Sequence, residues 1–259
     1  MKIFKKLLCL SIVLAAGFAQ ASTTATVPVK IKPLIDKTVI LVHGAFADGS
    51  GWNKVIPTLQ AAGLKVVSVQ HPLTSLADDV AVVKRAIENA TGPVILVGHS
   101  YGGQIITEAG DNAKVESLVY VAAFAPSEGQ SPADQAKDYP VAPGFMNLAL
   151  DQFGFVSLTW DGMKNDFAQD LTAEEQNLMW VTQGPTAAGC FTDVSSVAAW
   201  KTKPSWYIVA QDDRMIQPDL QRALAVKLNA TTVSLSTSHV PMLSKPAEVA
   251  ATIIAAAAL

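Results

Sequence analysis

One short stretch of the chain has the residue types and spacing that nucleophilic catalysis needs. Residues 98–103 read GHSYGG, a G-x-S-x-G pattern that follows an apolar run and precedes a segment with helical character. In this arrangement the serine occupies a sharp, strained turn, and the glycines remove side chains that would clash there. The pattern therefore predicts that Ser100 is a nucleophile on a turn between a strand and a helix.

A serine nucleophile needs a base, and the chain has only four histidines. After a turn of this kind the acid and then the histidine follow in sequence, so the base must lie after Ser100. Only His239 does, in a loop after the last expected strand. We therefore predict His239 as the base and interpret His43, His71 and His99 as structural.

The base needs a carboxylate that orients its imidazole and stabilises the imidazolium. Three candidates follow the apolar run that ends at residue 209, namely Asp212, Asp213 and Asp219. A carboxylate at Asp219 suits the first turn of the next helix, where it complements the helix dipole. Of the two neighbours we select Asp213 and assign Asp212 to the loop surface.

The oxyanion of an acyl-transfer intermediate needs two preorganised N–H donors. One is the backbone N–H of Tyr101, directly after the nucleophile. The other is expected from the loop after residue 42, where Gly44 permits a tight turn and Ala45 supplies the N–H. The chain has no H-x-H, no H-E-x-x-H and no Cys/His cluster, so we expect neither a metal nor another cofactor.

The elements that must position these residues alternate along the chain. Half of the residues are hydrophobic, which excludes a disordered chain. Unbroken apolar runs predict buried parallel strands, and helical stretches lie between them. The runs are 38–42, 65–69, 93–97, 117–122, 205–209 and 231–235, and the helical stretches are 75–90, 102–109, 218–228 and 247–258. This alternation predicts an α/β fold with a mostly parallel central sheet flanked by helices.

The segment 124–203 interrupts the alternation. It contains no strong strand, and proline and glycine separate short helical pieces, one of which should begin at a capping box formed by Thr172 and Glu175. We interpret it as a helical cap inserted into a core made of 38–123 and 204–259. Most cap aromatics are expected to form the cap's own small core. The candidate substrate-binding residues are Phe46, Trp52, Trp160 and Trp180.

Residues 1–21 have the pattern of a secretory signal peptide. Three lysines precede the apolar run 7–18, and Ala-Gln-Ala then forms a cleavage site. A run of about 12 residues is too short for a stable membrane anchor, which needs roughly 20. We expect export to a periplasm or the medium, with 22–37 as a linker. Only Cys190 would remain, so no internal disulfide can form, and we expect a buried thiol.

Four motifs together resemble the α/β-hydrolase superfamily. They are LVHGAF at 41–46, GHSYGG at 98–103, YIVAQDDRMI at 207–216 and SHVPMLSKP at 238–246. Within it the chain is most similar to small bacterial serine esterases of the plant methyl esterase and hydroxynitrile lyase branch. The resemblance implies the α/β-hydrolase fold and Ala45 and Tyr101 as oxyanion donors. It also implies an acid three residues before Ile or Val, a spacing that Asp213 and Ile216 match.

Two other functions are compatible with this resemblance. Hydroxynitrile lyases of the branch carry Lys after the catalytic histidine and Thr after the histidine of the oxyanion loop, whereas this chain has Val240 and Gly44. A ligand-binding receptor on a hydrolase scaffold is the second alternative, and the complete set of Ser100, Asp213 and His239 argues against it. We therefore expect an exported serine carboxylesterase acting on small, uncharged carboxylic esters, aryl esters among them.

The chain's charge limits its partners. A formal net charge of −3 with a pI near 5.8 gives no electrostatic reason to expect nucleic acid. The expected partner is a small-molecule ester. The sequence contains no signal for an oligomeric state.

Overall fold

The computed structural model describes residues 34–259. The expected signal peptide, 1–21, and positions 22–33 of the expected linker lie outside the described residues. The strands are β1 (Thr38–Val42), β2 (Lys65–Ser68), β3 (Val94–His99), β4 (Val115–Val121), β5 (Leu148–Leu150), β6 (Phe155–Leu158), β7 (Thr186–Ala187), β8 (Ser205–Ala210) and β9 (Thr231–Leu235). The α-helices are α1 (Ile56–Ala61), α2 (Leu76–Asn89), α3 (Gly102–Ala109), α4 (Pro132–Ala136), α5 (Trp160–Gly162), α6 (Ala173–Thr182), α7 (Pro218–Lys227), α8 (Pro241–Ser244) and α9 (Pro246–Ala257).

Six of these strands form a central sheet in the order β2-β1-β3-β4-β8-β9. Every neighbouring pair in it is parallel. All residues of β1, β3 and β8 are buried, as expected for β-branched apolar runs covered on both faces. The predicted parallel α/β sheet is therefore confirmed, and each of the six strands lies where an apolar run predicted one.

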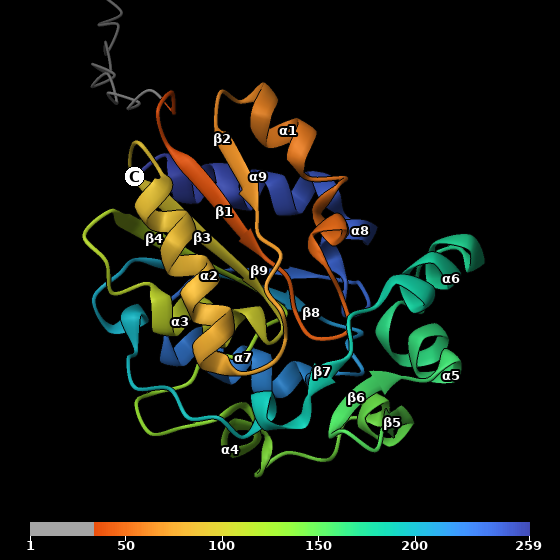
Figure 1. Cartoon of the computed structure of the whole chain (residues 1–259). Coiled ribbons are helices and arrows are strands. Elements are labelled where there is room, and N and C mark those ends of the chain that lie inside the picture. The colour runs from red at the N-terminus through yellow and green to blue at the C-terminus, as the bar shows by residue number, and fades with distance from the viewer. Residues whose placement is uncertain (1–33) are drawn as a thin grey trace, which may run out of the picture. The chain divides into compact units, whose positions relative to one another are not determined.

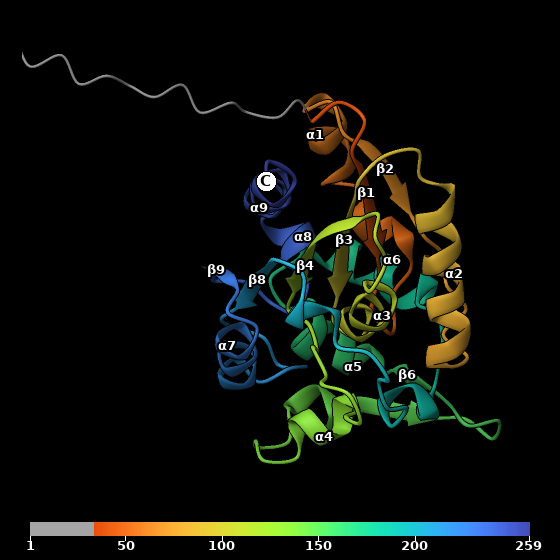
Figure 2. The ribbon, with the colours of Figure 1, turned by 90° about the vertical axis from the view of Figure 1, so that its left-hand side faces the viewer.

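Helices cover both faces of this sheet (Figure 2). Helix α2 packs on α3, which contacts β1, β3 and β4, while α9 packs with α1 and contacts β3, β4 and β8. Ser75 begins α2, since its side chain accepts a hydrogen bond from the backbone N–H of Asp78. Among residues 34–259, no helix is both long and apolar enough to cross a membrane.

The segment between β4 and β8 differs from the helical cap that the sequence predicts. It contains a three-stranded antiparallel sheet, β5-β6-β7, beside short helices (Figure 1, green to cyan). The sequence indicates no strong strand in 124–203, and the structure adds three short strands to the expected helical pieces. Asp151 forms the turn between β5 and β6 by accepting hydrogen bonds from the N–H groups of Phe153 and Phe155, and Gly154 has a positive φ of 86°. Strands of two to four residues are too short for a periodicity argument.

The capping box predicted in this segment is present. The Thr172 side chain accepts from the N–H of Glu175, and the Glu175 carboxylate accepts from the N–H of Thr172. This reciprocal pair satisfies two N–H groups at the start of α6. The helix thereby begins at the residue that the sequence indicates.

Candidate active site

Ser100 lies on a strained turn between β3 and α3. Its φ is +53°, a value that residues other than glycine rarely adopt. Neighbouring backbone segments can approach this turn closely only because glycines flank Ser100. A Cβ added to Gly98 would lie 2.4 Å from the carbonyl oxygen of Gly102, and a Cβ added to Gly102 would lie 2.6 Å from the carbonyl oxygen of His43. The sequence pattern thus produces the sharp strand-to-helix turn that a nucleophilic serine needs.

The structure brings His239 and Asp213 together across 26 positions of sequence. His239 Nδ1 lies 2.7 Å from Asp213 Oδ2. His239 is 1% exposed and Asp213 is 4% exposed. Since a carboxylate only accepts, Nδ1 carries the proton and Nε2 presents its lone pair. His239 Nε2 has no hydrogen-bond partner within residues 34–259, so that lone pair is free to accept a proton.

Three hydrogen-bond donors besides His239 hold the Asp213 carboxylate. Oδ1 accepts from the backbone N–H groups of Met215 and Ile216 at 2.7 and 3.0 Å. Oδ2 also accepts from Gln221 Nε2 at 2.7 Å. These bonds fix the direction of the carboxylate. The other two candidate acids, Asp212 and Asp219, are exposed, and Asp219 pairs with Arg222 on the surface of α7.

His99, directly before the nucleophile, positions the loop that carries the base. Its Nε2 donates to the carbonyl oxygen of His239 at 2.7 Å, and the two ring centroids are 4.7 Å apart. Burial, together with the neighbouring His239, holds the pKa of His99 well below its usual value, so the ring is neutral. His99 therefore fixes the His239 backbone and belongs to the structural group, as the sequence predicts.

Trp52 is placed differently from the expectation that it binds substrate. Its side chain is 0% exposed and packs edge-on against His99, with ring centroids 6.5 Å apart. The indole is therefore a packing support beneath the active-site loops. The expectation failed because a tryptophan in the 3₁₀ helix Gly49–Trp52 can point inward or outward, and the sequence does not distinguish these directions.

The loop after β1 lies directly against the nucleophile. A Cβ added to Gly44 would lie 2.7 Å from the Ser100 Cβ, so only glycine permits this approach. Ala45 follows within the same loop and is 3% exposed. Phe46 then has a positive φ of 59°, and its N–H donates to Thr186 Oγ1 in β7 at 3.4 Å. Ala45 therefore lies in the loop that packs against Ser100, and Tyr101 follows Ser100 directly on its turn.

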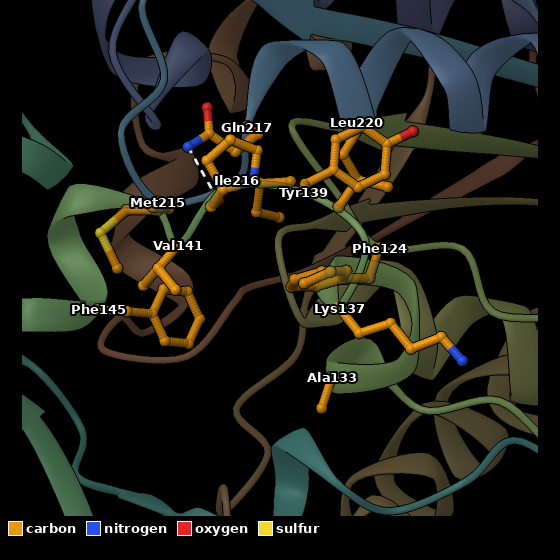
Figure 3. Close-up of a pocket in the computed structure, with 13 residues that line it drawn as sticks. Phe124, Ala133, Lys137, Tyr139, Val141, Phe145, Met215, Ile216, Gln217 and Leu220 are labelled. Carbon is orange, nitrogen blue, oxygen red and sulfur yellow. Dashed lines mark hydrogen bonds between the residues drawn. The ribbon is translucent and has the colours of Figure 1, made fainter.

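A cavity of about 280 Å³ lies beside the acid loop (Figure 3). Met215 and Ile216, whose N–H groups hold Asp213, form part of its wall, and Phe124, whose N–H donates to the Ser100 carbonyl at 3.1 Å, forms another part. Lys137 is the one charged residue of the lining. The remaining lining residues are Ala133, Ala136, Tyr139, Pro140, Val141, Ala142, Phe145, Gln217 and Leu220. The cavity is thus largely apolar.

A second cavity, of about 380 Å³, lies between the oxyanion loop and cap helix α6. Phe46, a predicted substrate-binding residue, lines it, and Leu178 and Met179 line it from α6. Trp160 and Trp180 line neither of these two cavities and instead pack on each other with ring centroids 5.7 Å apart. The structure therefore brings neither Trp160, in α5, nor Trp180, in α6, to these two cavities, and their role in substrate binding stays a prediction.

A second histidine–aspartate pair lies in the core and was missed as a pair. His71 Nδ1 is 3.3 Å from Asp79 Oδ1, and neither side chain is exposed. His43 and His71 stack with ring centroids 3.7 Å apart. One signal was available in the sequence: Asp79 occupies the apolar stripe of α2, which is otherwise made of Leu76, Val80, Val83 and Ile87. A carboxylate on such a stripe needs buried partners.

The remaining chemical expectations concern the thiol and metals. Cys190 is a free, buried cysteine, as predicted, and burial raises the pKa of its thiol to about 11. It is therefore protonated at neutral pH and weakly nucleophilic. Within residues 34–259, no three His, Cys, Asp or Glu side chains gather closely enough to hold a metal ion.

Comparisons with known proteins agree with this fold. A sequence model of the alpha/beta hydrolase family matches residues 39–252. The chain is 27% identical to Methylesterase 2 of Arabidopsis thaliana, over 80% of this chain and 90% of that protein. It is 28% identical to the Pyrethroid hydrolase of Sphingobium wenxiniae, over 82% of this chain and 84% of that protein. The crystal structure of polyneuridine aldehyde esterase superposes with a TM-score of 0.74 at 20% identity, covering 85% of this chain and 98% of that one.

Proposed function

The chain belongs to the alpha/beta hydrolase family and is related to the plant methylesterases, and from this we propose that it is a serine carboxylesterase. The observation that carries the proposal is the contact of His239 with Asp213 at 2.7 Å, on the loops that surround the strained Ser100. Two relatives named for ester or pyrethroid hydrolysis support the same reaction class.

The first half of the reaction acylates Ser100. His239 Nε2 takes the hydroxyl proton as Ser100 Oγ attacks the ester carbonyl carbon, and the carbonyl electron pair moves to oxygen. The backbone N–H groups of Ala45 and Tyr101 hold the resulting oxyanion. When the tetrahedral intermediate collapses, the imidazolium gives its proton to the leaving alkoxide, and the alcohol departs.

The second half releases the acid. A water molecule loses a proton to His239 and attacks the acyl carbon, and the same N–H groups hold the second oxyanion. Collapse breaks the bond to Ser100 Oγ, which takes the proton back from His239. Asp213 stabilises the imidazolium in both halves, since its own carboxylate is fixed by Met215, Ile216 and Gln221.

The proposed substrates are small and uncharged, aryl esters among them. The cavity beside the acid loop has an apolar lining apart from Lys137, Tyr139 and Gln217. The second cavity combines the apolar Phe46, Leu178 and Met179 with charged residues at Asp48, Lys54 and Glu175. A charged acyl group in the first cavity would lose its hydration without gaining a buried partner. We also propose that the protein is exported, because residues 1–21 combine a basic start, an apolar run and a small-residue cleavage site.

The test is hydrolysis of p-nitrophenyl acetate, butyrate and octanoate by purified protein, beside Ser100→Ala. We expect turnover above about 1 s⁻¹ for at least one ester and a loss of about 10³-fold or more in Ser100→Ala. Ser234→Ala, an exposed serine in β9, is the matched control and should keep full activity. Folded wild-type protein that hydrolyses none of the three esters would contradict the proposal.

A further inference from the structure

We propose that Asp79 is a positioning residue for both oxyanion N–H donors, Tyr101 through a direct hydrogen bond and Ala45 through the buried contact of Asp79 with His71, which hydrogen-bonds the oxyanion loop. The inference rests on the proposed function, because it concerns the oxyanion that ester hydrolysis would form. Asp79 lies in the first turn of α2 and is 0% exposed. None of the roles assigned to Ser100, Asp213 or His239 uses it.

The first arm consists of Tyr101 alone. Its hydroxyl donates to Asp79 Oδ2 at 2.9 Å, and its side chain is 0% exposed. Burial and the neighbouring Asp79 raise the pKa of Tyr101 above its usual value, so the hydroxyl keeps its proton and remains a donor. Tyr101 follows Ser100 directly, and its backbone N–H is one proposed oxyanion donor. Anchoring the ring therefore limits rotation of the residue that carries this N–H.

The second arm passes through two histidines to the oxyanion loop. His71 Nε2 donates to the carbonyl oxygen of His43 at 3.0 Å, and His43 Nδ1 donates to the carbonyl oxygen of Gly44 at 2.9 Å. A peptide unit is planar, so the Gly44 carbonyl and the Ala45 N–H point in opposite directions from one rigid plane. Fixing the Gly44 carbonyl therefore fixes the direction of the Ala45 N–H. The stacking of the two rings, at an interplanar angle of 9°, holds this arm in place.

His71 and Asp79 touch within the core without a hydrogen bond between them. A carbonyl oxygen only accepts, so His71 Nε2 carries the hydrogen that bonds the His43 carbonyl. His71 Nδ1 lies 3.3 Å from Asp79 Oδ1 and has no hydrogen-bond partner among the described residues. Oδ1 instead accepts from the Leu73 N–H at 2.8 Å. The carboxylate therefore holds the His71 ring by close contact in the buried core, and the hydrogen bond of that ring continues to the oxyanion loop.

The partners of Asp79 explain why a carboxylate occupies an apolar stripe. Burying a charge is costly unless it is paired and hydrogen-bonded, so an aliphatic side chain would serve packing better. Apart from the Leu73 N–H, the side-chain contacts of Asp79 lead to Tyr101 and, through His71 and His43, to Gly44. These are the two loops that flank Ser100. The carboxylate therefore couples the two loops to one fixed point on α2.

Two substitutions test this role. In Asp79→Asn the single amide oxygen cannot accept from both the Leu73 N–H and the Tyr101 hydroxyl, which bond different oxygens of the carboxylate. In Tyr101→Phe the backbone N–H remains and only the anchoring hydroxyl is lost. Tyr120→Phe is the matched control, since Tyr120 is equally buried and its hydroxyl bonds Thr107, away from both loops. All variants are compared with wild type in p-nitrophenyl butyrate hydrolysis and by thermal unfolding.

We expect kcat to fall about 10- to 100-fold in Asp79→Asn and about 3- to 10-fold in Tyr101→Phe, because displaced donors weaken transition-state binding. KM should change by less than about 3-fold, since the donors act chiefly after the ground state. An alkyl trifluoromethyl ketone reports on the donors directly. Ser100 Oγ adds to its carbonyl carbon, the serine proton moves to His239, and an oxyanion forms. The inhibition constant of the ketone should rise in each variant by the same factor by which kcat falls. The inhibition constant of butyrate, the product acid, should not change.

Each outcome decides between the hypotheses. A folded Asp79→Asn or Tyr101→Phe with wild-type kcat would overturn the inference and leave the proposed function intact. Equal losses in Tyr101→Phe and Tyr120→Phe would also overturn it, because any buried hydroxyl would then matter as much. If Asp79→Asn fails to fold, Tyr101→Phe and the ketone decide. A wild type that hydrolyses no ester would remove the proposed function and this inference together.

Discussion

Two histidine–aspartate pairs are buried in this chain, His239 with Asp213 and His71 with Asp79, and they differ in what the second nitrogen of each ring does. His239 bonds Asp213 through Nδ1, and its Nε2 has no hydrogen-bond partner within residues 34–259. His71 faces Asp79 through Nδ1, and its Nε2 donates to the His43 carbonyl oxygen. One ring can therefore accept a proton from a substrate or nucleophile, and the other cannot.

The carboxylates differ in the same way. Asp213 is saturated by two backbone N–H groups and an amide, which leaves it with the single task of orienting His239. Asp79 divides its oxygens between His71 and Tyr101, which belong to different loops. Burial and a histidine–carboxylate contact thus do not by themselves identify a catalytic base. What distinguishes His239 is that its Nδ1 bonds a fixed carboxylate while its Nε2 makes no hydrogen bond within residues 34–259, whereas the Nε2 atoms of His71 and His99 already donate to backbone carbonyls.

The largest expected effect comes from replacing the aspartate of the first pair, His239 with Asp213, by asparagine, as in Asp79→Asn. In Asp213→Asn the amide would donate toward His239 Nδ1, which favours the tautomer whose Nε2 carries the hydrogen and cannot accept the Ser100 proton. We expect kcat for p-nitrophenyl butyrate to fall about 10³- to 10⁴-fold. The loss should exceed that of Asp79→Asn by at least about tenfold, because one change removes the base and the other only displaces donors.

Asp212→Asn is the control for this prediction. Asp212 is adjacent in sequence but exposed, and only its backbone carbonyl bonds a neighbouring side chain, Gln169. It should keep its activity within about twofold, as surface substitutions usually do. Equal losses in Asp212→Asn and Asp213→Asn would show that the loop, rather than one carboxylate, matters. An unchanged kcat in Asp213→Asn would remove the distinction between the two pairs.

The sequence predicts the first pair much better than the second. Apolar runs locate all six strands of the central sheet, because unbroken burial on both faces leaves a signal in each run. Ser100, Asp213 and His239 each follow one of those strands, so their meeting at one sheet edge follows from the topology. The contact at 2.7 Å between Asp213 and His239 is what that reasoning leads one to look for.

The second pair leaves only a faint sequence signal. His71 follows β2 and Asp79 lies in α2, and their approach to Tyr101 depends on how α2 packs on α3. Nothing in local periodicity encodes that packing. The same limit explains Trp52, whose inward direction is set by contact with His99. It also explains the cap strands, where β7 has only two residues and is defined by its partner β6.

Acid pH should reveal the histidines that burial keeps neutral. Burial, and secondarily His71, lower the pKa of His43 to about 3, while its hydrogen bond to the Gly44 carbonyl and the charge of Asp48 oppose the shift. A pKa depressed in the folded state means that the unfolded chain binds the proton first. The contribution of His43 to the free energy of unfolding is therefore complete above its pKa in the unfolded chain, about 6.5. It is lost as the pH falls toward about 3. His99, buried against His239, acts in the same direction.

We expect the free energy of unfolding, measured by urea titration, to fall by about 1.4 kcal/mol per pH unit for each such histidine between about pH 6 and 4. His43→Gln, which removes one titrating group, should show a shallower slope even if it is less stable at pH 7. The slope should persist in 0.5 M salt, because buried groups are poorly screened. A free energy of unfolding that is flat from pH 7 to 4 would contradict the neutral, buried state of both rings.

The smallest expected effect concerns the ion pair of Lys54 with Glu175. It contrasts with the two buried histidine–aspartate pairs because it lies at the surface, in contact with water. Lys54 Nζ lies 2.6 Å from Glu175 Oε1 and also donates to the Leu243 carbonyl, which ties the start of α6 to the core beside the second cavity. The Lys54 ammonium, followed by bonds from Thr172, lowers the pKa of Glu175 to about 2. The side chains are 43% and 34% exposed, so water screens most of this attraction. Lys54→Met should therefore cost less than about 1 kcal/mol of unfolding free energy.

The position of Lys54 still distinguishes it from an ordinary surface lysine. Lys201, which pairs with Glu128 at similar exposure, supplies the control Lys201→Met. Both variants should unfold at nearly the wild-type urea concentration. Only Lys54→Met should change KM for p-nitrophenyl esters, by up to about tenfold with kcat unchanged, because it loosens a cavity wall and leaves the transition-state donors in place. A fall in kcat in Lys54→Met would mean that the cap holds the oxyanion loop as firmly as the buried Asp79 does. An unchanged KM would mean that α6 does not contact the substrate.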